Sequence, residues 1–357
     1  MKISYIIPTY NCGIFLKECV VSIIRADAYY HEIIIVDDCS TDETKIIVDD
    51  LLEKFKNIKY FRNDRNRGCS YSRNYGLINA TGDFCSFIDA DDLVDANFGK
   101  VCFQFESQNF DAIYFGYKCI VNRRNIDEQS EIDLNMNNKI WLKKDINYLV
   151  VNLLHPEDNL LKKCSLFSPW GGCYSRIFLL DNGICFDESM TIAEDVKFNI
   201  EVIKRANRIV TNGYISYYYY KNVNSSGRSY NNNAISIGVD ANNKINLTLG
   251  GMLSDYNVDK ANNYSIIYRF WWTIVSDFYH MDNEENVLKK EKRLKKLYNI
   301  HMYKEAFAKL DREVIEFMPF NMKLIIVLIK HKMFFLGAVI CKGRIVWAKM
   351  RKAFKIK

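Results

Sequence analysis

Three acidic residues end an apolar strand in the stretch Phe87-Ile88-Asp89-Ala90-Asp91-Asp92. Aspartate is depleted in strands, and neighbouring carboxylates repel one another. A divalent cation that is itself bound to the phosphates of a ligand would relieve this repulsion. The alternative is a solvated strand end that leads into the N-cap of a helix beginning near Asp95. The sequence around this stretch decides between the two.

Apolar strand patterns and helical patterns alternate up to this point. Strands are expected at residues 3–8, 32–36, 59–62 and 84–88, and helices at 14–25, from the segment 40–43 to about 55, and at about 71–80. Ser40-Thr41-Asp42-Glu43 fits a capping box for the second helix. This alternation predicts an α/β fold with a mostly parallel central sheet flanked by helices. Ligands of such sheets bind at the carboxyl ends of the strands, so residues 8–11, 37–38 and 89–92 are expected to line one cleft.

Composition describes a folded protein without a cysteine-based zinc site or a disulfide framework. The chain has 357 residues, of which 49% are hydrophobic, 26% charged and 14% aromatic. Aromatic-rich sites often stack on sugar or base rings, although most rings are core. None of the 11 cysteines forms a C-x-x-C pair, which argues against zinc and disulfides and favours free thiols in a reducing cytoplasm. The chain opens on a strand pattern, so a signal peptide is not expected.

Four motifs resemble those of the family 2 glycosyltransferases, which are inverting enzymes of the Rossmann-like GT-A fold. They are Pro8-Thr9-Tyr10-Asn11, Val36-Asp37-Asp38-Cys39-Ser40-Thr41-Asp42, Asn66-Arg67-Gly68 with Ser72-Arg73-Asn74-Tyr75-Gly76-Leu77, and Phe87-Ile88-Asp89-Ala90-Asp91-Asp92. Each motif alone is a weak signal, but all four keep the family's order and spacing. The resemblance is firm over residues 1–120 and extends to about 220. The Gln-x-x-Arg-Trp motif of processive synthases is not found, which implies transfer of one sugar per encounter.

The resemblance implies a site for a nucleoside diphosphate sugar. Asp38 corresponds to the carboxylate that accepts the uracil N3–H, Tyr10 to the ring beside the base, and Arg73 to a fork that reaches the base or a phosphate. The full expected set for the donor nucleotide is Pro8, Tyr10, Asp37, Asp38, Arg73, Asp89 and Ala90. Asp91 is the expected ligand of Mn²⁺ or Mg²⁺, which would stabilise the departing diphosphate. Asp92 is expected either to join through water or to cap the next helix. The alternatives are an Asx turn at Asp37-Asp38 and a surface salt bridge at Arg73.

A second region resembles the acceptor side of non-processive members of the family. It comprises Ser168-Pro169-Trp170-Gly171-Gly172 and, further on, Ile192-Ala193-Glu194-Asp195. By the comparison Asp195 is the general base that takes the proton of an attacking hydroxyl, and Glu194 is its neighbour. Thr191-x-x-Glu194 is also a capping box, which leaves Glu194 a structural alternative. Trp170 either stacks on a sugar or lies in the core.

The net charge of +6 belongs to the last part of the chain. Residues 319–357 contain ten Lys or Arg and no Asp or Glu. The apolar runs there are too short for a membrane span, which needs roughly 18–20 residues. Basic residues mixed with Phe and Trp are typical of a helix on an anionic membrane surface. The alternative is an amphipathic helix packed on the body of the protein or on a partner.

These features predict a GT-A domain over residues 1–220, a helical extension over 221–318 and a basic amphipathic tail over 319–357. The polar residues 222–233 are expected to form a loop that closes over the donor or links the domains. The predicted function is metal-dependent, inverting transfer of a sugar from a nucleoside diphosphate, which the resemblance implies to be UDP, to a hydroxyl of a glycan or lipid-linked glycan during surface polysaccharide synthesis. The protein would be cytoplasmic and peripheral at the inner membrane surface.

Two other functions are compatible with an acidic nucleotide-binding sheet. A sugar-nucleotide nucleotidyltransferase would need a glycine-rich phosphate loop with a lysine near the first strand, which residues 8–13 lack. A non-catalytic membrane-recruited scaffold could retain the fold. Nucleic acid is not an expected partner, because no recognition fold accompanies the basic residues.

Overall fold

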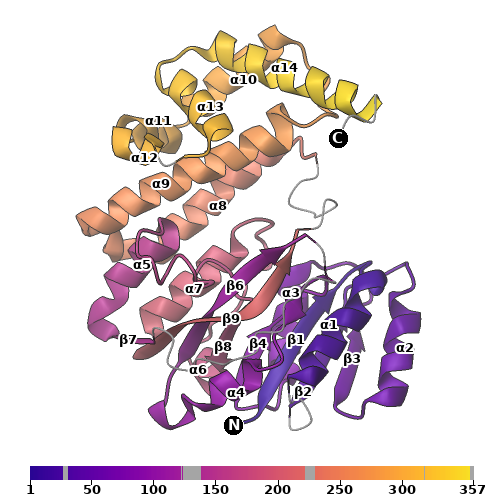
Figure 1. The fold of residues 1–357 in the computed structure, drawn as a ribbon. Helices are drawn as coiled ribbons and strands as arrows, with labels where there is room; N and C mark the ends of the chain where they lie inside the picture. The colour runs from indigo at the N-terminus through magenta and orange to yellow at the C-terminus, as the bar shows by residue number, and fades with distance from the viewer. Residues whose placement is uncertain (27–30, 122, 124–137, 222–229, 317, 354–357) are drawn as a thin grey trace. The chain divides into compact units, whose positions relative to one another are not determined.

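The computed structural model describes residues 1–26, 31–121, 123, 138–221, 230–316 and 318–353. Contacts divide the chain into two compact units, Met1–Asn222 and Val223–Lys357 (Figure 1). The predicted loop at 222–233 lies largely outside the described residues. The boundaries proposed at 220 and 318 remain predictions.

The described part of the first unit contains a nine-stranded sheet. Its strands are β1 (Ile3–Thr9), β2 (Glu32–Asp37), β3 (Ile58–Arg62), β4 (Phe84–Phe87), β5 (Leu93–Val94), β6 (Ala112–Ile120), β7 (Lys139–Leu142), β8 (Gly172–Ser175) and β9 (Arg208–Tyr220). They lie in the order β3-β2-β1-β4-β8-β6-β9-β5, and β7 pairs with β9. The first four strands are parallel, as predicted, whereas β8 runs antiparallel between β4 and β6.

Helices cover both faces of this sheet (Figure 1). They are α1 (Gly13–Arg25), α2 (Thr44–Lys54), α3 (Cys69–Asn79), α4 (Phe98–Phe103), α5 (Ile146–Leu154), α6 (Arg176–Asp181) and α7 (Glu194–Arg205). Leu16 and Val48 from α1 and α2 share one core with Ile33 and Ile35 of β2. Side chains alternate along a strand, so residues between these positions face the other layer.

The helix α3 packs unusually close to the strand β1. A Cβ added at Gly76 would lie only 2.4 Å from Cγ2 of Ile6. A residue with a side chain would therefore push α3 away from the sheet. The motif glycine at this position fixes the distance between α3 and β1, and with it the position of Arg73 on the same helix.

The predicted capping box at Ser40 is not formed. The helix α2 begins at Thr44, three residues later than a cap at Ser40 requires, and Asp42 accepts the Thr44 N–H at 3.0 Å. The Ser40 hydroxyl instead accepts the backbone N–H of Asn11 at 2.9 Å. These hydrogen bonds tie the end of β1 to the segment that follows β2, so two strand ends are held together.

The described part of the second unit is helical. It contains α8 (Ala234–Leu249), α9 (Tyr256–Thr273), α10 (Val287–Tyr298), α11 (His301–Ala308), α12 (Arg312–Glu316), α13 (Phe320–Lys330) and α14 (Phe334–Ala353), with a π-helical turn at Ile274–Phe278. Residues 287–308 form two helices, because α10 ends at Tyr298 and α11 begins at His301. The core of the second unit includes Phe270, Leu294, Phe307 and Ile326.

The last helix has two different faces. Phe334, Ala338, Cys341 and Ile345 recur at helical spacing and are buried in the second unit. The opposite stripe is exposed to between 41% and 61% and consists of Phe335, Leu336, Val339, Val346, Trp347 and Met350. One face therefore packs on the second unit, which is close to the alternative given for the tail, while the described residues leave the other face exposed. None of the described helices combines the length and the apolarity that a membrane crossing requires.

Candidate active site

The end of β2 organises the loop that leads into α3. Asp38 is buried, and its Oδ1 accepts hydrogen bonds from the Asn63 side-chain amide at 2.7 Å and the Arg67 N–H at 2.8 Å. Its Oδ2 accepts the N–H of Gly68 at 2.7 Å. Gly68 has a φ of 90°, a conformation that favours glycine. Among the described residues Oδ2 accepts one hydrogen bond, which leaves a lone pair for a ligand N–H.

The neighbouring Asp37 lies behind this surface. Its side chain is fully buried and accepts hydrogen bonds from Ser40 N–H, Tyr60 Oη and Arg62 Nη1 at 2.8 to 3.0 Å. A carboxylate with no exposed surface and these partners cannot also touch a nucleotide in this conformation. The expected contact of Asp37 with the nucleotide is therefore wrong in this structure. The side chain has a structural role instead, close to the Asx turn that was the alternative.

The acidic strand end divides into two partly exposed carboxylates and a buried one. Asp89 keeps 29% of its side chain exposed, and Asp91 is half-buried. Asp92 is fully buried, where Oδ2 accepts the Tyr217 hydroxyl at 2.6 Å and Oδ1 the Tyr220 N–H at 2.7 Å. Burial, together with the Asp89 charge, raises the pKa of Asp92. The expected roles of Asp92 as a water-mediated ligand or a helix cap are wrong, because β5 follows it and both oxygens face β9.

Arg73 joins the acidic strand end to the beginning of α7. This side chain is buried, so it is not the surface salt bridge considered as an alternative. Its Nη2 donates to Asp89 Oδ1 at 2.8 Å, and its Nη1 lies 3.5 Å from Glu194 Oε1. The guanidinium also lies 5.1 Å from the ring centre of Phe186. One cation thus connects an expected donor carboxylate with the expected acceptor side.

The beginning of α7 places two carboxylates side by side. Ala193 precedes the helix with a φ of 57° and no side-chain cap, so the capping box between Thr191 and Glu194 is not formed. Glu194 turns to Arg73 instead. Burial and the Glu194 charge raise the pKa of Asp195 to about 7, against the opposing effects of Val196 N–H and Arg73. A carboxylate with a pKa near the working pH is suited to general base catalysis.

The residues at β4 fit a divalent cation that arrives with its own oxygen ligands. In the described residues no group of three or more His, Cys, Asp and Glu side chains could hold a metal ion. Negative charge is nevertheless concentrated there. The pKa of the Cys12 thiol is raised to about 12, first by burial and then by the charges of Asp91 and Asp89. One or two carboxylates complete an octahedral site when a diphosphate supplies further oxygens.

The other predicted site residues differ in accessibility. Tyr10 follows β1 and is 50% exposed, whereas Pro8, within β1, and Ala90, after β4, are buried. Trp170 is only 6% exposed, and its ring is stacked on Tyr217 at 4.8 Å and on Tyr219 at 5.4 Å. Of the two alternatives for Trp170, the core position is the one observed.

The sequence profile described as glycosyl transferase family 2 matches residues 4–159. This chain carries a family 2 glycosyltransferase domain. The match contains the ends of β1, β2 and β4 with Asp38, Arg73, Asp89 and Asp91. The α7 carboxylates lie beyond it, so their assignment depends on the geometry described above.

Relatives extend the similarity past the family 2 profile. EpsJ of Bacillus subtilis (strain 168), described as an uncharacterized glycosyltransferase, is 29% identical over 226 residues, or 62% of each chain. TarS of Staphylococcus aureus, a poly(ribitol-phosphate) beta-N-acetylglucosaminyltransferase, is 30% identical over 224 residues, which are 61% of this chain and 35% of TarS. The alignments therefore span less than two thirds of either relative.

Solved structures confirm the GT-A fold expected for the family 2 domain. The S. aureus TarS 1–349 structure in complex with UDP has a TM-score of 0.61 at 22% identity and covers 96% of this chain and 91% of that one. The mannosyltransferase PcManGT from Pyrobaculum calidifontis, in complex with GDP-Man and Mn²⁺, has a TM-score of 0.51 at 15% identity, covering 97% and 87%.

Two residues of the first unit have structural roles that the sequence did not indicate. The Asn74 amide donates to Phe186 O at 2.9 Å and accepts the Phe186 N–H at 2.9 Å, which fixes the ring under Arg73. Asn74 stood inside a quoted motif, so its position was visible but its partner was not. Tyr217 carries no local signal, because its partner Asp92 is 125 residues away in the sequence.

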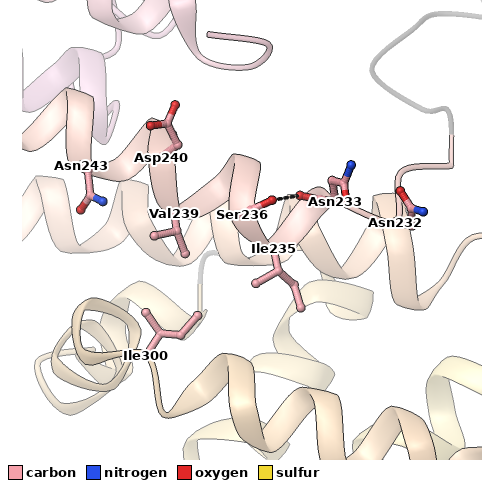
Figure 2. Close-up of a pocket in the computed structure, with 8 residues that line it drawn as sticks. All are labelled: Asn232, Asn233, Ile235, Ser236, Val239, Asp240, Asn243 and Ile300. Carbon is pink, nitrogen blue, oxygen red and sulfur yellow. Dashed lines mark hydrogen bonds between the residues drawn. The ribbon is translucent and has the colours of Figure 1, made fainter. Parts of the chain in front are cut away.

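A surface depression of about 500 Å³ lies in the second unit, outside the family 2 domain. Figure 2 shows Ile235 and Val239 on the side of α8 that faces Ile300, with Asp240 on the opposite side. Asp240 is the single carboxylate of this lining, and it pairs with Lys244 at 2.7 Å. The depression lacks the paired carboxylates of the strand-end site, which remains the candidate active site.

Proposed function

We propose that the first unit transfers a sugar, with inversion, from a nucleoside diphosphate donor to an acceptor hydroxyl. The observation that carries this proposal is the Arg73 bridge, which brings Asp89 at the donor side and Glu194 beside Asp195 into one network. A UDP-sugar is the proposed donor. Structures of the relative TarS contain UDP and UDP-GlcNAc, which supports this choice.

The proposed donor site uses groups at three strand ends. Asp38 would accept the N3–H of uracil through the free lone pair of Oδ2, and Tyr10 would stack its exposed ring beside the base. Asp89 would face the ribose. Asp91 would hold Mn²⁺ or Mg²⁺, which supplies charge stabilisation for the departing diphosphate when bound. The Mn²⁺ in the PcManGT complex supports a divalent ion at this position of the fold.

Asp195 would act as the base for the acceptor. As the hydroxyl oxygen forms its bond to the anomeric carbon, the bond from that carbon to the diphosphate oxygen breaks and its electron pair leaves with the diphosphate. The hydroxyl proton passes to the Asp195 carboxylate. Attack from the face opposite the diphosphate inverts the anomeric centre. A raised pKa makes Asp195 a stronger base than an ordinary aspartate while leaving it ionised above neutral pH.

Paired variants test this assignment. Asp91→Asn and Asp195→Asn are each expected to lower sugar transfer at least about 100-fold, because each removes a charge that acts in the transition state. Asp181→Asn, an exposed position on α6, is the matched control. Asp91→Asn should also weaken metal-dependent UDP binding, whereas Asp195→Asn should not. Near wild-type transfer by both variants would refute the mechanism, and diphosphate release from UTP and a sugar phosphate would favour the nucleotidyltransferase.

We further propose that the acceptor is a glycan or lipid-linked glycan and that the protein works at the cytoplasmic membrane surface. The uncovered stripe of α14 supports this proposal, since it combines exposed Phe335 and Trp347 with a segment whose charged residues are all basic. An apolar stripe flanked by lysine and arginine matches an anionic bilayer in chemistry. TarS, named for a ribitol-phosphate polymer, supports a surface-glycan acceptor.

Vesicle sedimentation tests the membrane proposal. Binding is expected with phosphatidylglycerol in phosphatidylcholine vesicles, and much weaker binding with phosphatidylcholine alone. The double variant Phe335→Ser with Trp347→Ser should lose binding, whereas Leu247→Ser, which removes an apolar side chain 81% exposed on α8, should keep it. Equal binding by all three proteins would refute the role of α14.

A further inference from the structure

The hydroxyl of Tyr217 has two hydrogen bonds to the acidic strand end. It donates to Asp92 Oδ2 at 2.6 Å and accepts the backbone N–H of Asp89 at 3.2 Å. Both the tyrosine and Asp92 are fully buried. A single oxygen atom on β9 therefore holds the first and the last residue of the acidic stretch.

The same strand fixes the stretch at further points. The Tyr220 N–H donates to Asp92 Oδ1 at 2.7 Å, and Asp92 N–H closes a turn onto Asp89 O at 3.0 Å. The residues that follow Asp92 form β5, which pairs with β9 through Leu93 and Val94. The segment that carries Asp89 and Asp91 therefore lies between β4 and β9, and these hydrogen bonds fix its backbone conformation.

The ring of Tyr217 is held as firmly as its hydroxyl. It stacks on Trp170 at a centroid distance of 4.8 Å and an interplanar angle of 12°. Trp170 in turn stacks on Tyr219 two residues along β9. Because the ring cannot swing away, the hydroxyl oxygen is available to Asp89 and Asp92 in one position.

We propose that Tyr217 is a positioning residue that sets the Asp91 carboxylate for the donor diphosphate and its cation. This inference rests on the proposed function of the strand-end site. Without the hydroxyl, the Asp89 N–H and the buried Asp92 Oδ2 each lose a partner. Unpaired buried polar groups are costly, so the turn between them would shift toward other partners and carry Asp91 with it.

Tyr217→Phe and Tyr218→Phe form a matched pair for the test. Both remove one buried hydroxyl of β9 that contacts an aspartate, since Tyr218 Oη donates to Asp95 Oδ2 at 3.1 Å. Of these two hydroxyls, that of Tyr217 bonds to Asp89 and Asp92, whereas that of Tyr218 bonds to Asp95. Calorimetry with UDP and Mn²⁺, and nuclear magnetic resonance titration with uridine, which lacks phosphates, separate the diphosphate contact from the base contact.

Tyr217→Phe is expected to weaken Mn²⁺-dependent UDP binding about tenfold and to raise the donor KM by a similar factor, with uridine binding unchanged. Tyr218→Phe should keep both affinities within about twofold. Asp92→Asn, which keeps the side-chain size but removes the charge from the same hydrogen bond, is the second variant and should show a smaller loss of UDP affinity.

The outcomes separate this inference from the proposed function. Equal UDP affinity in wild type, Tyr217→Phe and Asp92→Asn would overturn the positioning role while leaving the donor site intact. Parallel losses of UDP and uridine binding would also overturn it, because they would indicate a general loss of structure. If the wild-type protein binds no UDP with Mn²⁺, the proposed function itself fails.

Discussion

Replacement of Asp195 by asparagine is expected to stabilise the fold at the same time as it abolishes transfer. The pKa of this carboxyl is about 7 in the folded chain, compared with about 3.9 for an unperturbed aspartate. The folded state therefore holds the proton more tightly than the unfolded state between these values. Stability is lost as pH rises through this window, by up to about 1.4 kcal/mol for each pH unit.

The size of the effect follows from the exposure of the side chain. Asp195 is half-buried, so solvent screening reduces the full-window value of about 4 kcal/mol. Asp195→Asn cannot ionise and is expected to be about 1–3 kcal/mol more stable than wild type at pH 8, with the difference shrinking toward zero near pH 4.5. Urea unfolding at the two pH values measures this, with Asp181→Asn as the control that should show no such gain.

The wild-type enzyme should show the same ionisation in its rate. Below pH 7 the fraction of ionised base falls, so kcat/KM should drop about tenfold for each further pH unit. Two results would refute the reasoning. One is an Asp195→Asn variant no more stable than wild type at pH 8, and the other is a rate that stays flat down to pH 5.

Three further substitutions test other parts of the structure. Gly76→Ala should destabilise the fold by roughly 1–3 kcal/mol in thermal or urea unfolding, because its Cβ would lie 2.4 Å from Ile6, whereas Gly251→Ala, with nothing within 4 Å, should not. Asp37→Asn should cost about 1–3 kcal/mol of stability and leave the donor KM within about twofold; a larger KM change would place Asp37 in contact with the nucleotide. Tyr10→Ala should leave stability unchanged and raise the donor KM about tenfold, and an unchanged KM would contradict stacking on the base.

The first half of the sheet was predictable because its strands and helices follow one another along the chain. The apolar run at residues 32–36 and the helical pattern after it can be recognised from neighbouring residues alone. The observed strand and helix begin and end within a few residues of the predicted bounds. The second half depends on pairing between distant segments. β8 is four residues long and joins β4 to β6, and nothing in its own sequence indicates those neighbours.

The candidate site shows the same division. The resemblance to the family pointed to Asp38, Arg73, Asp89 and Asp195, and the structure brings Arg73 within 3.5 Å of both Asp89 and Glu194. Burial separates residues that look alike in sequence. Asp37 and Asp38 are adjacent, yet only Asp38 keeps a carboxylate lone pair for a ligand, because Tyr60 and Arg62 reach Asp37 from β3.

Under the proposed function, the guanidinium of Arg73 would make donor occupancy and the protonation of Asp195 two linked equilibria. A donor and cation that draw Asp89 toward themselves would weaken its ion pair with Arg73 and leave more of that positive charge for Glu194 and Asp195. More positive charge near Asp195 favours its ionised form. The apparent pKa of the base would then be lower in the donor complex than in the free enzyme, so that donor binding itself prepares the site to accept a proton.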